Sequence, residues 1–289
     1  MHDLLQQAFS GLATGGIYAI VALALVMIYQ TTHHVNFAQG EMAMFSTYVA
    51  WALIEAGVPY WGSFVLTTVF GFVLGAFVER VVVRPMADAP VLALVIVFVG
   101  LLVIFNSLAG LLFGHSVQSF PSPFPSRGIA GGLLSAHQLG TLAITMVMLV
   151  LLFCFFRFTK AGLAMRAVAQ NPESSSLVGI RVGGVLGLGW ALASTIGAIA
   201  GMLVAPVTFL DPNMMMSVLV YAFAGALLGG ISSPGGAVIG GLLVGVLENL
   251  AGAFLIGNEL KLTLALVLIV TVLTVRPVGL FGQRHVSRV

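Results

Sequence analysis

The sequence predicts an all-α fold, a polytopic bundle of membrane-spanning helices. Three observations indicate this class: 60% of the residues are hydrophobic, only 7% are charged, and the mean hydropathy is +1.12. The apolar runs are long enough for helices that cross the hydrocarbon core, which takes about 20 residues. A membrane β-barrel shows short segments of alternating hydrophobicity instead. We therefore expect one transmembrane domain over residues 1–289.

Nine apolar segments are candidate spans, and eight or ten crossings are close alternatives. They lie at about 8–29, 36–55, 63–82, 91–112, 138–156, 187–207, 217–231, 236–255 and 261–276. The segment 217–231 covers only about 23 Å of helix, so it is a short crossing or half of a re-entrant hairpin. The SSPGG turn at 232–236 then reverses the chain. The start, MHDLLQQAF, lacks the basic region of a cleavable signal peptide, so we expect the first run to be retained.

The distribution of basic residues predicts the orientation. Nine of the eleven Lys and Arg residues fall in three segments, and Arg127 and Lys261 are the exceptions. Such segments face the cytoplasm by the positive-inside rule. Counting crossings between them places the N-terminus outside and the C-terminus in the cytoplasm. The nine residues are Arg80, Arg84, Arg157, Lys160, Arg166, Arg181, Arg276, Arg284 and Arg288.

The longest of these polar segments, 157–184, reads RFTKAGLAMRAVAQNPESSSLVGIRVGG. Gly162 to Gln170 is predicted to be a short helix, and Asn171-Pro172 supplies the cap and first position of a second one. Gly179 is suited to end that second helix. A short helical pair on a membrane surface is typical of a docking element. We therefore expect a cytoplasmic coupling loop for a separate motor, with anchoring at anionic lipid headgroups as the alternative.

Glycine spacing predicts close helix packing. Five matches to small-xxx-small occur, at 11–15, 71–75, 197–201, 225–229 and 241–245. This spacing lets helix backbones approach where lipid gives no hydrophobic drive for association. A weak echo between 42–53 and 214–227, each after a polar stretch with an asparagine, suggests duplicated halves, which are common in transporters.

Two carboxylates lie at membrane depth, Glu41 and Glu248. Ionisable groups there are costly and usually face the bundle interior, so each either lines a substrate path or hydrogen-bonds a neighbouring helix. His33 and His34 have no third strong ligand spaced to join them, so no metal site is predicted. The net charge of +2 gives no indication of nucleic-acid binding.

Several classes of protein are disfavoured by missing features. The chain has no GxxxxGK[ST] phosphate loop, no mid-span histidine to activate a serine nucleophile, and no row of span arginines. Few span charges are present for a proton or sodium relay. We expect no enzyme activity and no cofactor.

Four motifs in order, however, resemble the permease subunits of bacterial branched-chain amino-acid ABC importers of the LivH type, over nearly the whole chain. They are NFAQGEMAMFSTYVAW, AGLAMRAVAQNPESSSLVGIRV, VYAFAGALLGGISSPGGAVIGGLLVGVLE and VLTVRPVGLFG. One departure is Gln39, where relatives usually carry histidine. Permeases for urea, short amides and aromatic acids belong to the same family.

The resemblance implies an inner-membrane permease that works by alternating access. Its implied partners are a second homologous permease subunit, two cytoplasmic ABC ATPase subunits, an extracytoplasmic solute-binding protein, the amino-acid substrate and the lipid bilayer. Loop 157–184 then corresponds to the coupling element. A urea or short-amide permease and a passive channel for a small neutral solute remain alternatives.

The residues expected to act fall into two groups. The ATPase-coupling residues are Arg166, Asn171, Pro172, Glu173, Gly179 and Arg181. The residues expected along the substrate path are Asn36, Glu41, Asp211, Asn213, Glu248 and Asn249.

Overall fold

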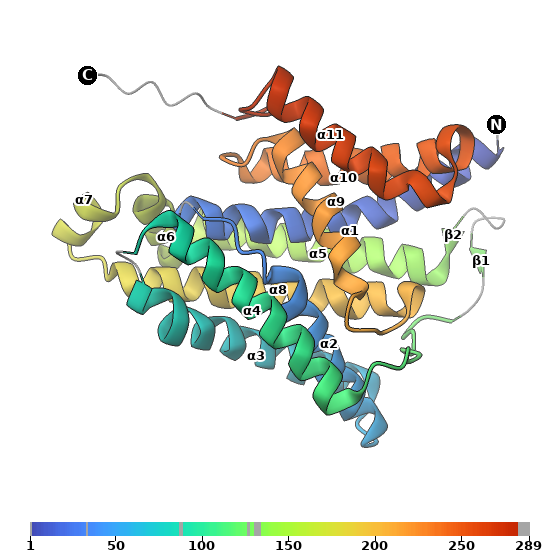
Figure 1. Cartoon of the computed structure of the whole chain (residues 1–289), viewed down its shortest axis with the longest axis horizontal. Helices are drawn as coiled ribbons and strands as arrows, with labels where there is room; N and C mark the ends of the chain where they lie inside the picture. The colour runs from blue at the N-terminus through green and yellow to red at the C-terminus, as the bar shows by residue number, and fades with distance from the viewer. Residues whose placement is uncertain (1, 33, 87–88, 126–127, 130–133, 283–289) are drawn as a thin grey trace. The chain divides into compact units, whose positions relative to one another are not determined.

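Each of the nine predicted apolar segments is an α-helix in the computed structural model, which describes residues 2–32, 34–86, 89–125, 128–129 and 134–282 (Figure 1). The helical-bundle prediction is therefore confirmed. The nine helices are α1 (His2–Thr32), α2 (Gln39–Glu55), α3 (Tyr60–Val78), α4 (Val91–Phe113), α5 (Ala136–Phe158), α8 (Val182–Thr208), α9 (Met214–Gly229), α10 (Pro234–Ala251) and α11 (Lys261–Val275). Arg127, Arg284, Arg288 and His33 lie outside the described residues.

Short elements join these helices. A π-helical turn (Glu79–Val83) and a 3-10 turn (Arg84–Met86) follow α3, and a second pair (Gly252–Ile256 and Asn258–Leu260) precedes α11. Two small helices, α6 (Lys160–Gln170) and α7 (Pro172–Leu177), lie between α5 and α8. Strands β1 (Gly128–Ile129) and β2 (Leu134–Ser135) pair antiparallel, Gly128 with Ser135 and Ile129 with Leu134.

Helix length separates two of the nine from the rest. In the described part of the chain, seven helical stretches are long and apolar enough to cross a membrane. The helices outside that set are α2, with 17 residues, and α9, with 16. At the helical rise they measure about 26 Å and 24 Å, below the roughly 30 Å of a hydrocarbon core. The number of crossings made by α9 and α10 stays a prediction.

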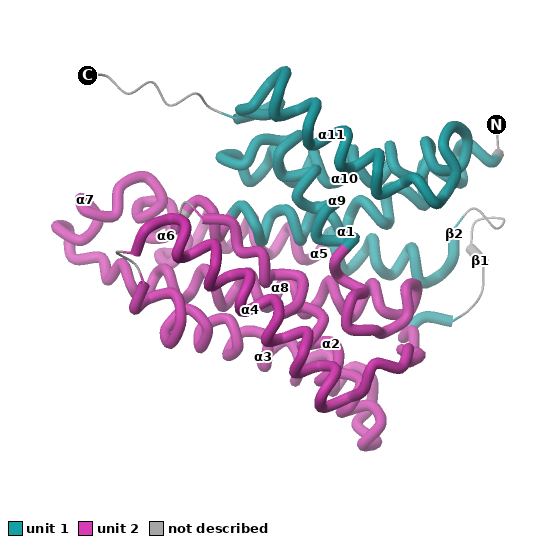
Figure 2. Tube along the Cα trace, viewed as in Figure 1, with its two compact units in different colours: residues 1–26, 124–146, 217–289 teal, residues 27–123, 147–216 magenta. Residues whose placement is uncertain are grey.

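The chain forms two compact units (Figure 2). Unit 1 contains residues 1–26, 124–146 and 217–289, and unit 2 contains 27–123 and 147–216. Helices α1 and α5 each begin in unit 1 and end in unit 2, so neither unit is a contiguous stretch of sequence.

In unit 2 the core is built around α8. A β-carbon on Gly75 of α3 would collide with the backbone carbonyl of Trp190, whose side chain is fully buried. Further along α8, a β-carbon on Gly201 would meet Thr47 and Ala43 of α2. The glycine spacings at 71–75 and 197–201 thus lie at helix contacts, as predicted.

In unit 1, α1 and α10 make the corresponding close approach. A β-carbon on Gly245 would collide with the backbone of Gly15. Helices α9 and α10 pack antiparallel through Gly225 and Gly241, so the chain reverses between them as predicted. Ser233 caps α10, its hydroxyl accepting a hydrogen bond from Gly236 N at 3.1 Å.

The predicted internal echo coincides with a shared arrangement of elements. A long buried helix, a polar connector and a short helix occur twice, as α1 to α2 and as α8 to α9. Helices α1 and α8 are also the most buried of the candidate spans, with 89% and 83% of their apolar stretches buried. The two connectors carry Asn36 and Asn213, the asparagines noted in the sequence.

Candidate functional site

The loop between α5 and α8 is a well-capped helical pair. The Thr159 hydroxyl accepts a hydrogen bond from Gly162 N at 3.0 Å and caps α6. The Asn171 side chain accepts one from Ser174 N at 2.9 Å and caps α7, in which Pro172 occupies the first position. Gly179 ends the second helix at a φ of +86°, a conformation that favours glycine. Both predicted helices are confirmed, and α6 begins two residues earlier than expected.

One face of the α6–α7 pair packs against the rest of the protein, and the opposite face is exposed. Gly162 packs directly on the backbone of Phe155 and Phe156 at the end of α5, and Met165 and Val168 are buried. The outward positions carry the predicted coupling residues Arg166, Glu173 and Arg181, all exposed. Two apolar side chains lie among them, Leu177 (87% exposed) and Val178 (77%). The structure thus presents a rigid surface of mixed charge and apolar character.

Arg84, just beyond α3, forms an ion pair with Glu79 and a hydrogen bond to the start of α8, contacts that sequence reasoning missed. Arg84 donates two hydrogen bonds to the Glu79 carboxylate, at 3.0 and 2.7 Å, and one to the Gly183 carbonyl at 2.6 Å. Glu79 is only 2% exposed. Because Gly183 lies at the end of loop 157–184, this contact places that loop and residues 79–86 at the same end of unit 2.

A polar cluster forms in unit 2 around Glu41, which is 3% exposed. The Asn106 amide of α4 donates to Glu41 Oε2 at 3.3 Å, to the Pro212 carbonyl at 2.9 Å and to Asn213 Oδ1 at 3.2 Å. Asp211 accepts a hydrogen bond from Asn213 N at 2.7 Å. The structure therefore brings three predicted path residues, Glu41, Asp211 and Asn213, to one place.

The cluster lies well inside the span of α4. Asn106 is about 10 Å along the helix from its end at Phe113 and about 22 Å from its start at Val91. It also lies away from the end of unit 2 that carries the coupling loop, because α4 starts just beyond Arg84. Polar groups at this depth of a transporter are where substrates are commonly bound.

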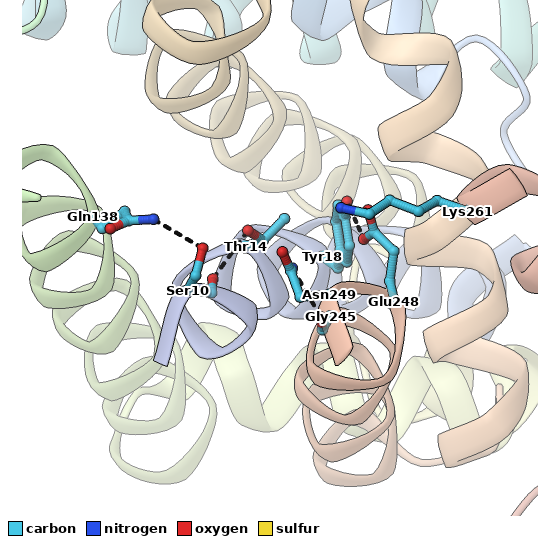
Figure 3. Close-up of polar contacts among 8 residues, drawn as sticks. All are labelled: Ser10, Thr14, Tyr18, Gln138, Gly245, Glu248, Asn249 and Lys261. Carbon is cyan, nitrogen blue, oxygen red and sulfur yellow. Dashed lines mark hydrogen bonds and ion pairs between the residues drawn. The ribbon is translucent and has the colours of Figure 1, made fainter. Parts of the chain in front are cut away.

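Glu248 and Asn249 belong to a different cluster, in unit 1 (Figure 3). Tyr18 donates a hydrogen bond to Glu248 Oε2 at 2.7 Å, and Lys261 Nζ lies 3.8 Å from Glu248 Oε1. The Tyr18 ring stacks on Tyr221 with centroids 5.0 Å apart. Asn249 donates to the Gly245 carbonyl of its own helix at 3.1 Å. The carboxylate of Glu248 is thus partnered by a cation and a phenol.

The remaining path candidate, Asn36, shapes the start of α2. Its Oδ1 accepts a hydrogen bond from Ala38 N at 3.0 Å, and its amide donates to Gln39 Oε1 at 3.4 Å. Gln39 in turn donates to the Ala193 carbonyl of α8 at 2.8 Å. The glutamine that departs from the usual histidine therefore fixes α2 against α8.

Sequence reasoning missed Asn106 and Glu79. An amide inside an otherwise apolar 23-residue run was a usable signal for Asn106. Glu79 was missed because Arg84, five positions later, made the segment resemble an ordinary charged loop between two helices. Glu79 is as buried as Glu41, although it lies at the end of α3.

A protein-family model matches most of the chain. The family model described as branched-chain amino acid transport system / permease component matches residues 7–273. LivH, a high-affinity branched-chain amino acid transport system permease protein of Salmonella typhimurium, is 30% identical, covering 99% of this chain and 97% of that protein. BraD of Pseudomonas aeruginosa, described in the same terms, is 28% identical, covering 100% and 99%.

A solved structure shares the fold. PsaBC from Streptococcus pneumoniae, determined in complex with a Fab, superposes with a TM-score of 0.53 at 14% sequence identity. The match covers 93% of this chain and 91% of that one. Identity this low supports the common arrangement of helices and nothing more specific.

Proposed function

Because the chain belongs to the family of branched-chain amino acid transport system permease components, we propose that it is the permease subunit of an ATP-binding-cassette importer for branched-chain amino acids. The family and the apolar helices make it a multi-pass membrane protein of the transport-permease class. What we propose is the type of importer, its partner subunits and its substrate.

The observation that carries this proposal is the exposed face of α6 and α7. A motor must push on a rigid element, and these helices are capped and packed on α5 and α8. Leu177 and Val178 are exposed on the same helical pair as Arg166 and Glu173. Protein interfaces combine such apolar anchors with charged rims.

On the cytoplasmic side, two ATPase subunits would bind this chain and a second, homologous permease subunit. ATP binding favours their closed arrangement and thereby shifts the permease pair between inward-facing and outward-facing states. A solute-binding protein outside the membrane delivers the amino acid. The N-terminus is then outside and the C-terminus in the cytoplasm.

Uptake into proteoliposomes tests the function. We expect leucine uptake by the reconstituted complex of both permeases, the ATPases and the binding protein, dependent on ATP and on every component. Urea supplied with the same complex should not accumulate. Leucine flux without the ATPase subunits would instead identify a passive channel, and ATP-driven urea uptake would identify the amide-transporting branch of the family.

Charge reversal tests the docking surface. We expect Arg166→Glu to reduce co-purification of the ATPase subunits by at least about tenfold, because reversing one charge at an interface opposes a complementary partner. Arg157→Glu is the matched control, an exposed arginine of the same segment at the end of α5. Equal losses from both substitutions would favour headgroup anchoring over docking.

A further inference from the structure

Helices α3 and α8 pack side by side and antiparallel in unit 2 (Figure 1). A β-carbon on Gly71 would lie 3.0 Å from Cβ of Ala198, and one on Gly75 would collide with the carbonyl oxygen of Trp190. Backbones that approach this closely hold helices together in a bilayer. Because packed interiors are hardly compressible, a displacement of one helix along this contact is passed to the other.

The same line of contact continues beyond α3, where two charged side chains take over from the glycines. The place of a β-carbon on Gly187 lies 3.1 Å from Glu79 Oε2, and that of a β-carbon on Gly183 lies 3.4 Å from Arg84 Cζ. Gly183 and Gly187 are four residues apart and therefore share one face of α8. The ion pair between Glu79 and Arg84 thus lies directly against the bare backbone at the start of α8.

The π-helical turn Glu79–Val83 sets the register of this ion pair. In an α-helix, residues five apart point about 140° away from each other, given 3.6 residues per turn. A π turn is closed by a bond between residues five apart, here from Arg84 N to the Glu79 carbonyl, which returns both residues to one face. Such turns are rare and occur frequently at functional sites.

Arg84 also bonds the end of loop 157–184 to the segment between α3 and α4. It donates a hydrogen bond to the Gly183 carbonyl at 2.6 Å. The other hydrogen bonds that the structure describes for this loop join its residues to one another, to the end of α5 or to α8. Among the described residues, Arg84 is therefore the polar link from the loop to the α3 side of unit 2.

We propose that Arg84 is a positioning residue for coupling. By holding Glu79 and the Gly183 carbonyl together, it makes α3 and α8 move as one body when a motor displaces loop 157–184. This inference rests on the proposed function. The contact of the α3 backbone with Trp190 lies about 10 Å further along α8 than Gly183. Without Arg84, the first turns of α8 would follow the loop while the end of α3 stayed behind.

Removing both charged groups tests the proposal without leaving a buried charge unpaired. Glu79→Met combined with Arg84→Met keeps two unbranched side chains, and replacing a buried ion pair by apolar groups of similar size is often neutral for stability. In the full reconstituted complex we expect an unfolding temperature close to that of the wild type and normal co-purification of the ATPase subunits. Leucine transported per ATP hydrolysed should fall at least about fivefold, a factor typical of coupling between sites.

The ratio of leucine to ATP separates coupling from folding, because it does not depend on the amount of active complex. A purely structural role predicts fewer active complexes with the wild-type ratio, and that result would overturn the proposal. Arg80→Met is the matched control, at an exposed arginine of the same π-helical turn, and should keep the wild-type ratio. An equal fall in the control would show a general effect of positive charge and overturn the assignment to Arg84.

Spin labels on both sides of the ion pair measure the movement itself. Val81→Cys and Gly184→Cys provide two exposed positions in a Cys154→Ser background. With Glu79 and Arg84 intact, the distance between the labels should be the same with and without ATP bound to the complex. In the double variant the distance should differ between the two states. A change with the ion pair intact, or none in the double variant, would refute the proposed common movement.

Failure of the importer function would give a different result. A wild-type complex that imports no leucine under any condition would refute that function and the role of Arg84 with it. Leucine import by the wild type, together with the wild-type ratio in the double variant, would leave the importer intact and remove only Arg84 from coupling.

Discussion

Three buried carboxylates differ in how each is stabilised. Glu248 has a lysine and a tyrosine, Glu79 has a bidentate arginine, and Glu41 has a shared amide. Burying a charge is tolerated when ion pairs and hydrogen bonds replace the lost water. By this measure Glu79 and Glu248 are satisfied within the chain by cations, whereas among the described residues Glu41 has only an amide donor.

The Arg84 contact gives a prediction at this scale. Arg84→Ala leaves the Glu79 carboxylate buried without its partner and frees the Gly183 carbonyl. We expect a loss of roughly 2 kcal/mol, less than for a fully buried pair because the Arg84 side chain is 39% exposed. Thermal unfolding of the detergent-solubilised protein measures the loss. Arg80→Ala, at an exposed neighbouring arginine, should leave the unfolding temperature unchanged.

At the scale of secondary-structure elements, helices contact one another at positions where no side chain fits. Gly75 sits against the Trp190 backbone and Gly245 against Gly15, whereas Gly100 of α4 has no atom near the place of a β-carbon. In a bilayer, association of helices relies on such close packing rather than on removal of apolar surface from water. The same residue type therefore has different importance on different helices.

Alanine substitutions at Gly75 and Gly100 test this difference in importance. Gly75→Ala should cost about 1–3 kcal/mol, because the α3 and α8 backbones must move apart. Gly100→Ala should be neutral or stabilising by up to about 1 kcal/mol, since alanine favours the helix. Unfolding temperatures of the two variants provide the comparison. Equal effects would show that α3 and α8 do not meet at Gly75.

The cap of α7 makes a further prediction for an element. Asn171→Ala removes the acceptor for Ser174 N and should destabilise α7 by about 1 kcal/mol. Amide hydrogen exchange of residues 173–178 should accelerate about fivefold, since that energy corresponds to a factor of this size. Ser174→Ala keeps the backbone donor and should leave exchange unchanged. ATPase co-purification should follow the exchange result.

For the whole molecule, each unit is a set of helices gathered from distant parts of the sequence. In unit 2, α3 begins after the turn at Ala56 and ends near Arg84, which contacts Gly183. The Ala56 turn and the coupling loop therefore lie at opposite ends of that unit. The proposed orientation puts the loop in the cytoplasm and the turn outside.

Labelling of single cysteines tests that orientation. The chain has one cysteine, Cys154, which is exposed, so Cys154→Ser provides the background. A membrane-impermeant maleimide should label Ser174→Cys only in inside-out vesicles and Ala56→Cys only in right-side-out ones. Both positions are exposed. Labelling of Ser174→Cys from outside would rule out docking of a cytoplasmic motor on α6 and α7.

The sequence by itself determined the elements of this protein. Apolar runs of membrane length, a proline after an asparagine, and glycine spacing each depend on residues close together in the chain, so the nine helices, the two loop helices and the close packing could all be predicted. The four quoted motifs likewise identified the family from local sequence alone.

Only the tertiary structure decided which polar residues meet. Asn106, Glu41 and Asn213 are separated by 65 and 107 positions along the chain, and Arg84 and Gly183 by 99. Nothing local distinguishes a carboxylate that meets a lysine from one that meets an amide, because the partner lies on another helix and helix packing brings the two together. That pairing separates Glu248, which meets a lysine and a tyrosine, from Glu41, which meets an amide.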